Sequence, residues 1–187
     1  MWRESGWVRR ALAWRRGIIL AVLALSVAFS APNVERIGDR LQVALPVLAL
    51  GCAVLTGGAG ELLVRYMIGT TMVHGSKVGL GERAINARPW GGFRGFPSGH
   101  SAAAAFGASA LVQQCVRRSP LVQGAVIIAA GFTGASRIEA GAHTIWQVLA
   151  GIVIGWASER LLRRNTPLRR RICTWFATRW RRRKQQP

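Results

Sequence analysis

Two histidines, several arginines and a Ser-Gly pair are concentrated in three short stretches of this chain, residues 77–89, 96–101 and 136–147. Arginine binds phosphate oxygens in a bidentate manner and stays charged, while a Ser-Gly pair at a helix start offers unpaired backbone N–H groups to an anion. Two histidines can divide a displacement between them, one attacking phosphorus and the other protonating the leaving oxygen. The combination predicts a site for a phosphate ester.

Metal-ligating residue types are sparse in the same stretches. They contain no convincing carboxylate cluster, so we expect chemistry that needs neither a metal nor another cofactor. The three cysteines, Cys52, Cys115 and Cys173, lie far apart in the sequence. Their spacing fits neither a metal site nor an even-numbered disulfide framework. We therefore expect the cysteines to be small, buried residues.

Six apolar segments must position the three stretches. They run approximately over residues 17–31, 41–59, 62–78, 101–116, 121–135 and 144–162. Several are shorter than the ~20 residues that span a bilayer, but a short segment can still cross when its flanking residues snorkel. Abundant Ala and Gly suit close helix packing inside a membrane, and no alternating β-type pattern is present. The sequence predicts an all-α fold, a bundle of six transmembrane helices.

The composition also favours a membrane protein. Of the 187 residues, 50% are hydrophobic, and 26 Lys and Arg against 7 Asp and Glu give a net charge of +19. Disordered chains are poor in apolar residues, so disorder is excluded as the main state. A soluble nucleic-acid-binding protein seldom devotes half its length to apolar residues, so we expect no nucleic-acid partner. Positive charge at the edges of apolar segments is typical of a protein in a bilayer.

Lysine and arginine gather in both terminal tails and in the turn at residues 117–118. With six spans all three regions lie on one side, which the positive-inside rule assigns to the cytoplasm. We expect a basic N-terminal tail over residues 1–16, a membrane domain over 17–162 and a basic C-terminal tail over 163–187, with both termini cytoplasmic. Tryptophan alternates with arginine in the tails, which predicts contact with anionic lipid headgroups. The first segment also has the features of a cleavable signal peptide.

The polar stretches resemble the signature of the type-2 phosphatidic acid phosphatase superfamily, in its membrane lipid-phosphatase branch. That signature reads Lys-x6-Arg-Pro, then Pro-Ser-Gly-His, then Ser-Arg-x5-His-x3-Asp. The second motif is complete as Pro97-Ser98-Gly99-His100, and the third is present as Ser136-Arg137, five residues and His143. The resemblance covers residues 77–162 by motif, and the six-segment layout extends it over most of the chain.

This resemblance implies a mechanism. His143 would be the nucleophile that forms a phosphohistidine, and His100 would protonate the departing alcohol and then activate water. The phosphate would be held by Arg88, by Arg137 and by the backbone of Ser98 and Gly99. His74 has no motif around it, and we expect a structural or interfacial role.

The resemblance also implies a substrate class. A site at the non-cytoplasmic membrane face, on the periplasmic or outer side of a bacterial inner (plasma) membrane, suits an amphiphile whose phosphate lies at headgroup level. Phosphatidic acid, phosphatidylglycerol phosphate, undecaprenyl pyrophosphate and the phosphates of lipid A all have this form. The resemblance therefore implies a multi-pass lipid phosphatase.

Two departures from the signature affect the expected site. Ten residues separate Lys77 from Arg88 where the family has six, and strict spacing falls on Gly81; either Lys77 or Arg83 fills that cation's role. The final Asp of the third motif is Gln147, whose carbonyl can hold the tautomer of His143 but supplies no negative charge.

The chain offers few replacements for the missing carboxylate. Its one aspartate, Asp39, is expected in the first non-cytoplasmic loop, and Glu139 lies within the third stretch. Two interpretations follow from Gln147: a slower phosphatase, or an impaired member of the family that binds lipid phosphate or serves as a membrane assembly partner through its basic C-terminal tail.

Overall fold

A computed structural model describes residues 6–30, 33–161, 163, 166–167, 170–171 and 173–175. The first five residues and most of the expected C-terminal tail, 163–187, lie outside the described residues. The described part is helical and contains no strand, which confirms the all-α prediction.

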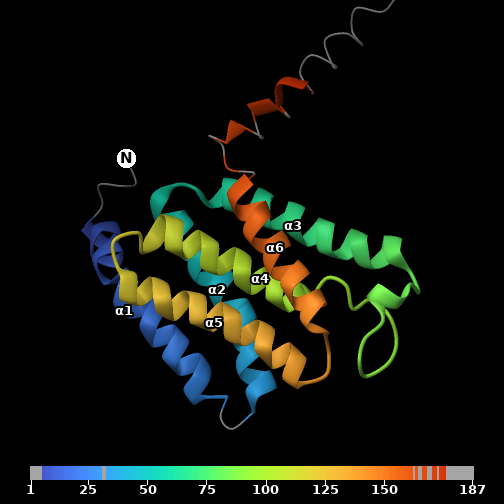
Figure 1. Cartoon of the computed structure of the whole chain (residues 1–187). Helices are drawn as coiled ribbons and strands as arrows, with labels where there is room; N and C mark the ends of the chain where they lie inside the picture. The colour runs from blue at the N-terminus through green and yellow to red at the C-terminus, as the bar shows by residue number, and fades with distance from the viewer. Residues whose placement is uncertain are drawn as a thin grey trace, which may run out of the picture.

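Six α-helices follow one another along the chain (Figure 1). They are α1 Gly6–Ala28, α2 Val34–Thr56, α3 Ala59–Leu80, α4 Gly99–Ala110, α5 Pro120–Glu139 and α6 Ile145–Leu161. A 3-10 turn, η2 Ala84–Asn86, interrupts the loop between α3 and α4, and a π-helical turn, η3 Leu111–Cys115, continues α4. Successive helices run in opposite directions, so the loops that carry the three polar stretches lie at one end of the bundle.

Two helices begin about two turns or more before their apolar segments. α1 starts at Gly6, inside the expected N-terminal tail. α2 starts at Val34, about two turns before the apolar run, because the Asn33 side chain accepts a hydrogen bond from the Arg36 backbone at 3.0 Å and caps the helix. Asp39 therefore lies within α2 and not in a loop, which corrects the sequence-based placement.

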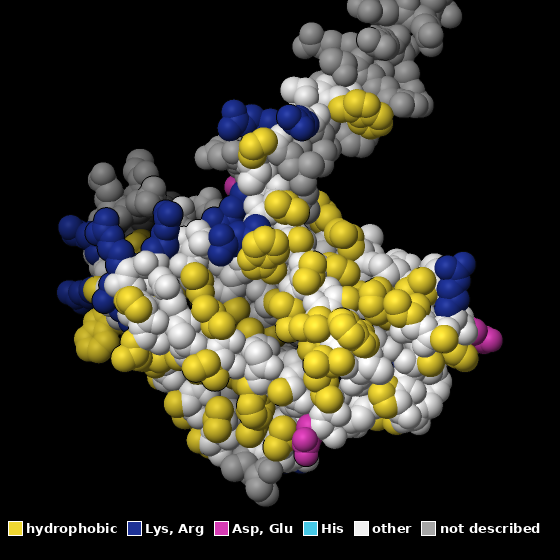
Figure 2. Space-filling model, in the orientation of Figure 1, with side chains coloured by type: hydrophobic (Ala, Val, Ile, Leu, Met, Phe, Trp, Pro, Cys, Tyr) yellow, Lys and Arg dark blue, Asp and Glu magenta, His cyan; other side chains and the backbone are white. Residues whose placement is uncertain are grey.

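The surface of the bundle is strongly apolar. α1, α2 and α5 are each long and apolar enough to cross a membrane, by length and composition. Large hydrophobic side chains are exposed on every one of the six helices except α4. Figure 2 shows them across the middle of one face, with lysine and arginine gathered at the end where α1 begins. A monomeric soluble protein rarely exposes apolar surface to this extent.

α4 lies at the centre of the bundle, between α2, α5 and α6 (Figure 1). Nine of its twelve residues are buried, and most of them are Ala, Ser or Gly. Two glycines of α6, Gly151 and Gly155, face it: a Cβ at either position would overlap the backbone oxygens of Ser98 and Ala102. This GxxxG spacing allows the two backbones to touch, as small residues do in membrane helix pairs.

The cysteine prediction was wrong in two respects: two of the cysteines form a disulfide, and the third is exposed. Cys52 of α2 and Cys115 of η3 form a disulfide, with their Cα atoms 6.1 Å apart. Both residues are buried, as expected, but the 63-residue separation in sequence concealed their proximity. Cys173 is exposed and free.

The α4–α6 contact generates a test. Replacing Gly155 by Ala introduces a methyl group where the backbone of Ala102 lies, and we expect the free energy of unfolding to fall by about 1–3 kcal/mol or more. The matched control is Gly51→Ala in α2, where a Cβ meets no atom within 4 Å. Chemical denaturation in detergent measures both variants, and equal stabilities would contradict the close packing.

Candidate functional site

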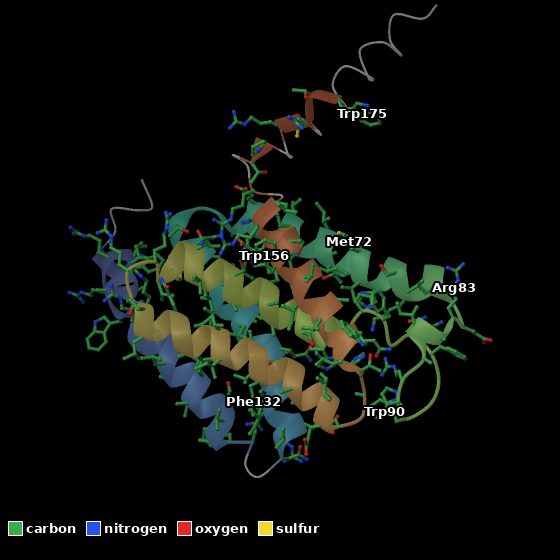
Figure 3. The ribbon with its side chains drawn as sticks, viewed as in Figure 1. Met72, Arg83, Trp90, Phe132, Trp156 and Trp175 are labelled. Atoms are coloured by element: carbon green, nitrogen blue, oxygen red, sulfur yellow. A yellow bond between two sulfur atoms is a disulfide. The ribbon has the colours of Figure 1, made fainter. Side chains whose placement is uncertain are left out.

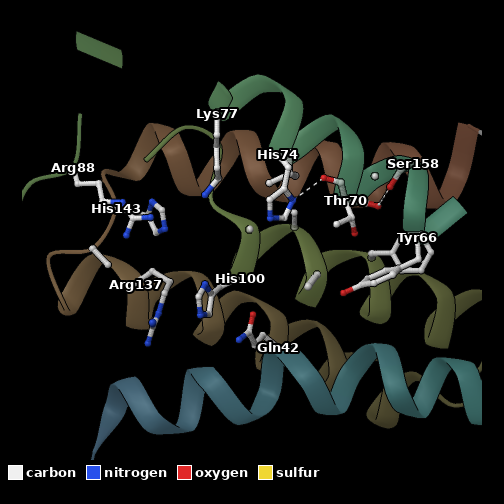
Figure 4. A pocket seen from close by; sticks show the side chains of 18 of the residues that line it. Gln42, Tyr66, Thr70, His74, Lys77, Arg88, His100, Arg137, His143 and Ser158 are labelled. Atoms are coloured by element: carbon white, nitrogen blue, oxygen red, sulfur yellow. Dashed lines mark hydrogen bonds between the residues drawn. The ribbon is translucent and has the colours of Figure 1, made fainter. Parts of the chain in front are cut away.

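The three polar stretches meet around a cavity of about 360 Å³ at one end of the bundle. Figure 4 shows the charged and imidazole groups that converge on it from different elements. They are Lys77 of α3, Arg88 of the following loop, His100 of α4, Arg137 of α5 and His143 of the loop before α6. Two histidines and three cations from positions far apart in the sequence therefore share one cavity.

His143 is held by Gln147, one turn further along the chain. The His143 ring Nδ1 lies 3.1 Å from Gln147 Oε1. The Gln147 Nε2 donates to the carbonyl oxygens of Ile85 and Ala87 at 3.1 and 2.7 Å. An amide nitrogen has no acceptor capacity, so these two carbonyls fix the direction of the Gln147 amide and make Oε1 the acceptor from His143 Nδ1–H. The lone pair of His143 Nε2 is then free to act as a nucleophile.

The Gln147 amide also ties the site loop to α6. Its Oε1 accepts from the Thr144 backbone N–H, and the backbone carbonyl of Gln147 accepts from the Ser98 backbone N–H at 2.8 Å. Gly95 packs directly on the amide: a Cβ there would lie within 3 Å of its nitrogen, oxygen and carbon atoms. The side chain is 2% exposed and satisfied at both ends. Gln147 therefore positions both His143 and the loop that carries Arg88.

Burial and nearby cations keep His143 neutral. Burial, the largest cause, and the charges of Lys77, Arg88 and His100 together lower its pKa from 6.5 to about 4, although the hydrogen bond to Gln147 opposes the shift. A neutral imidazole is the form that attacks, so His143 is competent at any pH well above 4. In the unfolded chain the imidazole binds a proton near pH 6.5, whereas in the folded chain it does so only near pH 4. Protonation therefore favours the unfolded chain, and the free energy of unfolding falls as the pH drops from 6.5 toward 4.

The second histidine has a carboxylate partner that the sequence did not reveal. His100 Nε2 lies 3.2 Å from Asp39 Oδ1, and the same oxygen lies 3.1 Å from Arg137 Nη1. Glu35, one turn before Asp39, accepts from Arg137 through its backbone oxygen at 3.0 Å. The first turns of α2 thus supply the negative charge of the site, whereas Glu139 is exposed and outside the cavity.

A glycine permits this approach of α2. A Cβ at Gly38 would overlap the Ser136 side chain, so α2 and α5 can come this close only at that position. The neighbouring residue in α2 is Asp39, and the neighbouring residue in α5 is Arg137. The close contact therefore sets the Asp39–Arg137 pair. The Gly38-Asp39 pair, together with the Ser136-Arg137 motif, is the sequence signal that could have indicated this ion pair.

Both arginines of the site keep unused donor capacity. The buried Nε of Arg88 and that of Arg137 have no hydrogen-bond partner among the described residues. Arg88 donates weakly to the Arg94 carbonyl at 3.4 Å and lies over the Trp90 ring at 5.7 Å. Two guanidinium groups with open donors beside a neutral imidazole form an environment suited to phosphate oxygens.

The choice between Lys77 and Arg83 follows from the length of α3. That helix continues to Leu80, so Lys77 lies in its last turn and lines the cavity. Arg83 is exposed beyond the helix end, at the outer edge of the bundle (Figure 3). Lys77 is therefore the candidate whose side chain reaches the other cations.

Ser98 and Gly99 differ in their positions. Ser98 is fully buried, its side chain caps α4 by accepting from Ser101, and its backbone N–H donates to Gln147. Gly99 lines the cavity at the first residue of the helix. The α4 N-terminus thus points toward the cavity with Gly99, while Ser98 holds α4 against α6.

The cavity continues from the charged end into the bundle. Its inner part is lined by Gly69, Val73, Ala103 and Phe106, and His74 lies on its wall with Nδ1 2.9 Å from the Thr70 carbonyl. A second, apolar hollow of about 260 Å³ between α2 and α3 shares Tyr66, Phe106 and two further lining residues with it. A charged site therefore adjoins a groove suited to hydrocarbon.

Metal-ligating groups do not gather in the described part of the chain: no three His, Cys, Asp or Glu side chains there could hold one ion. The charged groups of the cavity are cations, the opposite of what a metal ion requires.

Comparison with known proteins supports this description. The family model described as the PAP2 superfamily matches residues 18–171. A curated protein of Helicobacter pylori (strain J99 / ATCC 700824), named lipid A 4'-phosphatase, is 35% identical over 138 residues, a match that covers 65% of this chain and 65% of that relative. The chain thus spans just under two thirds of that relative's length. No solved structure matches this chain significantly.

The His143–Gln147 contact can be tested by substitution. Gln147→Glu keeps the length of the side chain but places a carboxylate against Nδ1–H, which favours the imidazolium, so we expect the pKa of His143 to rise from about 4 toward its ordinary value. The same change removes both donors to the loop carbonyls, so the folded state becomes less stable. NMR of histidine-labelled protein in micelles follows the titration.

Two further variants make this measurement interpretable. His143→Gln identifies the resonance by its disappearance, and Glu139→Gln changes an exposed charge in the same stretch and leaves the titration of His143 where it was. An unchanged His143 titration in Gln147→Glu would show that the two side chains are not in contact.

Proposed function

The chain belongs to the PAP2 superfamily, and from this premise we propose that it is an integral-membrane lipid phosphatase that works through a phosphohistidine intermediate without a metal. The observation that supports this best is the cavity in which His143 and His100 face each other among Lys77, Arg88 and Arg137. Six transmembrane spans, with the cavity at the non-cytoplasmic face and both termini in the cytoplasm, complete the proposal.

In the first step Nε2 of His143 attacks phosphorus, and a P–N bond forms as the P–O bond to the lipid alcohol breaks. His100 donates its proton to the departing oxygen, so the alcohol leaves neutral. Arg88, Arg137 and Lys77 stabilise the charge on the three equatorial oxygens. Hydrogen bonding of Nδ1–H to Gln147 keeps the ring in the tautomer that can attack.

In the second step water attacks the phosphohistidine. Neutral His100 accepts the proton of the water, an O–P bond forms, the P–N bond breaks and inorganic phosphate leaves with His143 regenerated. Asp39 favours the protonated form of His100 before the first step and after the second, because its carboxylate lies 3.2 Å from the ring nitrogen. In the family signature a carboxylate contacts the nucleophilic histidine. In this chain the carboxylate of Asp39 instead contacts His100, the proposed acid.

The substrate is a lipid phosphate. The apolar hollow between α2 and α3 adjoins the charged cavity, so an acyl chain can lie there while the phosphate reaches the histidines. The relative named lipid A 4'-phosphatase makes a lipid A phosphate a leading candidate, beside phosphatidic acid, phosphatidylglycerol phosphate and undecaprenyl pyrophosphate. All four present a phosphate at the end of a hydrophobic molecule.

The first test is phosphate release from these four lipids by the purified protein in liposomes containing EDTA. We expect turnover that survives EDTA and falls by at least a factor on the order of 10³ in His143→Ala, since the nucleophile is lost. His74→Ala, on the wall of the same cavity, is the matched control and retains most of the activity.

An inert wild type would favour the other interpretation of Gln147. If wild-type protein and His143→Ala release no phosphate from any lipid but bind it equally, the chain is a lipid-phosphate binder or assembly partner and not an enzyme. Activity that EDTA abolishes would contradict the metal-independent mechanism.

The division of labour between the histidines has its own test, based on the leaving group. Nitrophenyl phosphate releases a stable anion that needs little protonation, whereas an alkyl phosphate needs an acid. We therefore expect His100→Ala to slow the first step, measured as the burst of released alcohol or nitrophenol, by roughly 10²–10⁴ on an alkyl phosphate and much less on nitrophenyl phosphate. Asp39→Asn shows the same pattern, weaker by about an order of magnitude.

His143→Ala provides the contrast, because the nucleophile is required with either leaving group. Equal losses of the first-step rate on both substrates in His100→Ala would show that His100 is not the acid.

A further inference from the structure

A second cavity lies on the other side of α4 and α6 from the candidate active site. It measures about 470 Å³ and runs between α4, α5 and α6. Small residues, among them Ala105, Ala108 and Gly131, form its floor, and Ile127, Val153 and Trp156 form its walls. No residue lines both this cavity and the active-site cavity. We name this second cavity the α4–α6 groove.

One end of the groove is polar and cationic. Arg160, in the last turn of α6, and Ser109 of α4 are its polar lining residues. The Arg160 Nε donates to the Ser109 hydroxyl at 3.1 Å, and its guanidinium lies over the Trp156 ring at 5.9 Å. Gln113 can accept from both terminal nitrogens of Arg160 in one orientation of its amide. These partners hold the guanidinium in place but are neutral.

The described residues around Arg160 carry more positive than negative charge. Glu159 is fully buried and accepts from Arg65 at 2.9 Å and from Arg163 at 3.0 Å, while it lies 3.8 Å from Arg160. Glu61 acts on Arg65 from the neighbouring turn of α3. Three guanidinium groups therefore share two carboxylates. Arg65 is buried, so the excess positive charge belongs to the exposed end of the cluster, at the mouth of the groove.

From this geometry we propose that the α4–α6 groove binds an anionic phospholipid, with an acyl chain along its small-residue floor and the headgroup phosphate at Arg160. Figure 2 shows the groove face, where apolar side chains lead to basic ones at the end of α6. Basic pockets between membrane helices on the cytoplasmic side are suited to such headgroups. The site is separate from the substrate cavity, and from the basic tails, because its apolar part lies within the bundle.

The proposal rests on the membrane location proposed above but not on catalysis. An anionic lipid bound here would contact α4 and α6 together, and through Ser109 and Glu159 it would act on Arg65 of α3. Lipid binding therefore stabilises the assembly of α3, α4 and α6. The other ends of these helices lie at the active-site cavity, with Lys77, His100 and the loop that carries His143.

The test measures thermal unfolding of the full-length protein in phosphatidylcholine vesicles with and without phosphatidylglycerol. For wild type we expect phosphatidylglycerol to raise Tm by roughly 3 °C or more. Arg160→Gln removes the charge, and Gly131→Leu fills the groove, where a Cβ meets no atom within 4 Å. Both variants should lose the shift. Gly124→Leu, on the same helix and also with open space at Cβ, is the matched control that keeps it.

Each other result would overturn the proposal. A shift of equal size in all variants would mean that anionic lipid acts on the basic tails. Loss in Arg160→Gln but not in Gly131→Leu would mean a surface charge effect without a groove, and no shift in wild type would mean no binding. If Gly131→Leu instead changes the ratio of dimer to monomer on crosslinking, the groove is an interface between copies. Because Tm is the readout, a catalytically inert protein can still confirm the site.

Discussion

The backbones of α4 and α6 can touch because Gly151 and Gly155 carry no side chains, and the rest of the structure depends on that contact. It brings the loop before α6, with His143, against the N-terminus of α4, with His100. It also allows the Ser98 backbone to donate to the Gln147 carbonyl, which connects the second and third polar stretches. The two cavities lie on opposite sides of this helix pair, so one packing constraint defines both the charged site and the α4–α6 groove.

Charge in the site is distributed differently from the pattern of the family it belongs to. Gln147, the partner of His143, is neutral, and the carboxylate of Asp39 lies instead between His100 and Arg137. A neutral partner leaves burial and three neighbouring cations to keep His143 unprotonated. The carboxylate beside His100 favours the protonated imidazole that an acid requires. The two histidines therefore have different electrostatic surroundings: cations and a neutral amide surround His143, whereas a carboxylate lies beside His100.

The local parts of this arrangement could be predicted from sequence, and the non-local parts could not. Motif spacing identified His100, His143, Arg88 and Arg137, because each lies at a fixed offset within one stretch. The apolar segments predicted the six helices. The first turns of α2 are polar, so the apolar pattern did not include them, and Asp39 was assigned to a loop. The Cys52–Cys115 disulfide and the Asp39–His100 pair join residues more than 60 positions apart, and only the packing of α2 against α4 brings them together.

The two departures from the family signature contact each other in this structure. The segment between Lys77 and Arg88 contains the 3-10 turn Ala84–Asn86, and the carbonyls of Ile85 and Ala87 accept from the Gln147 side chain. A carboxylate at that position would face two backbone oxygens with no proton to offer them, whereas an amide satisfies both and still accepts from His143. The loop and residue 147 are therefore coupled through two hydrogen bonds, so a change to a carboxylate at 147 leaves both loop carbonyls without their donor.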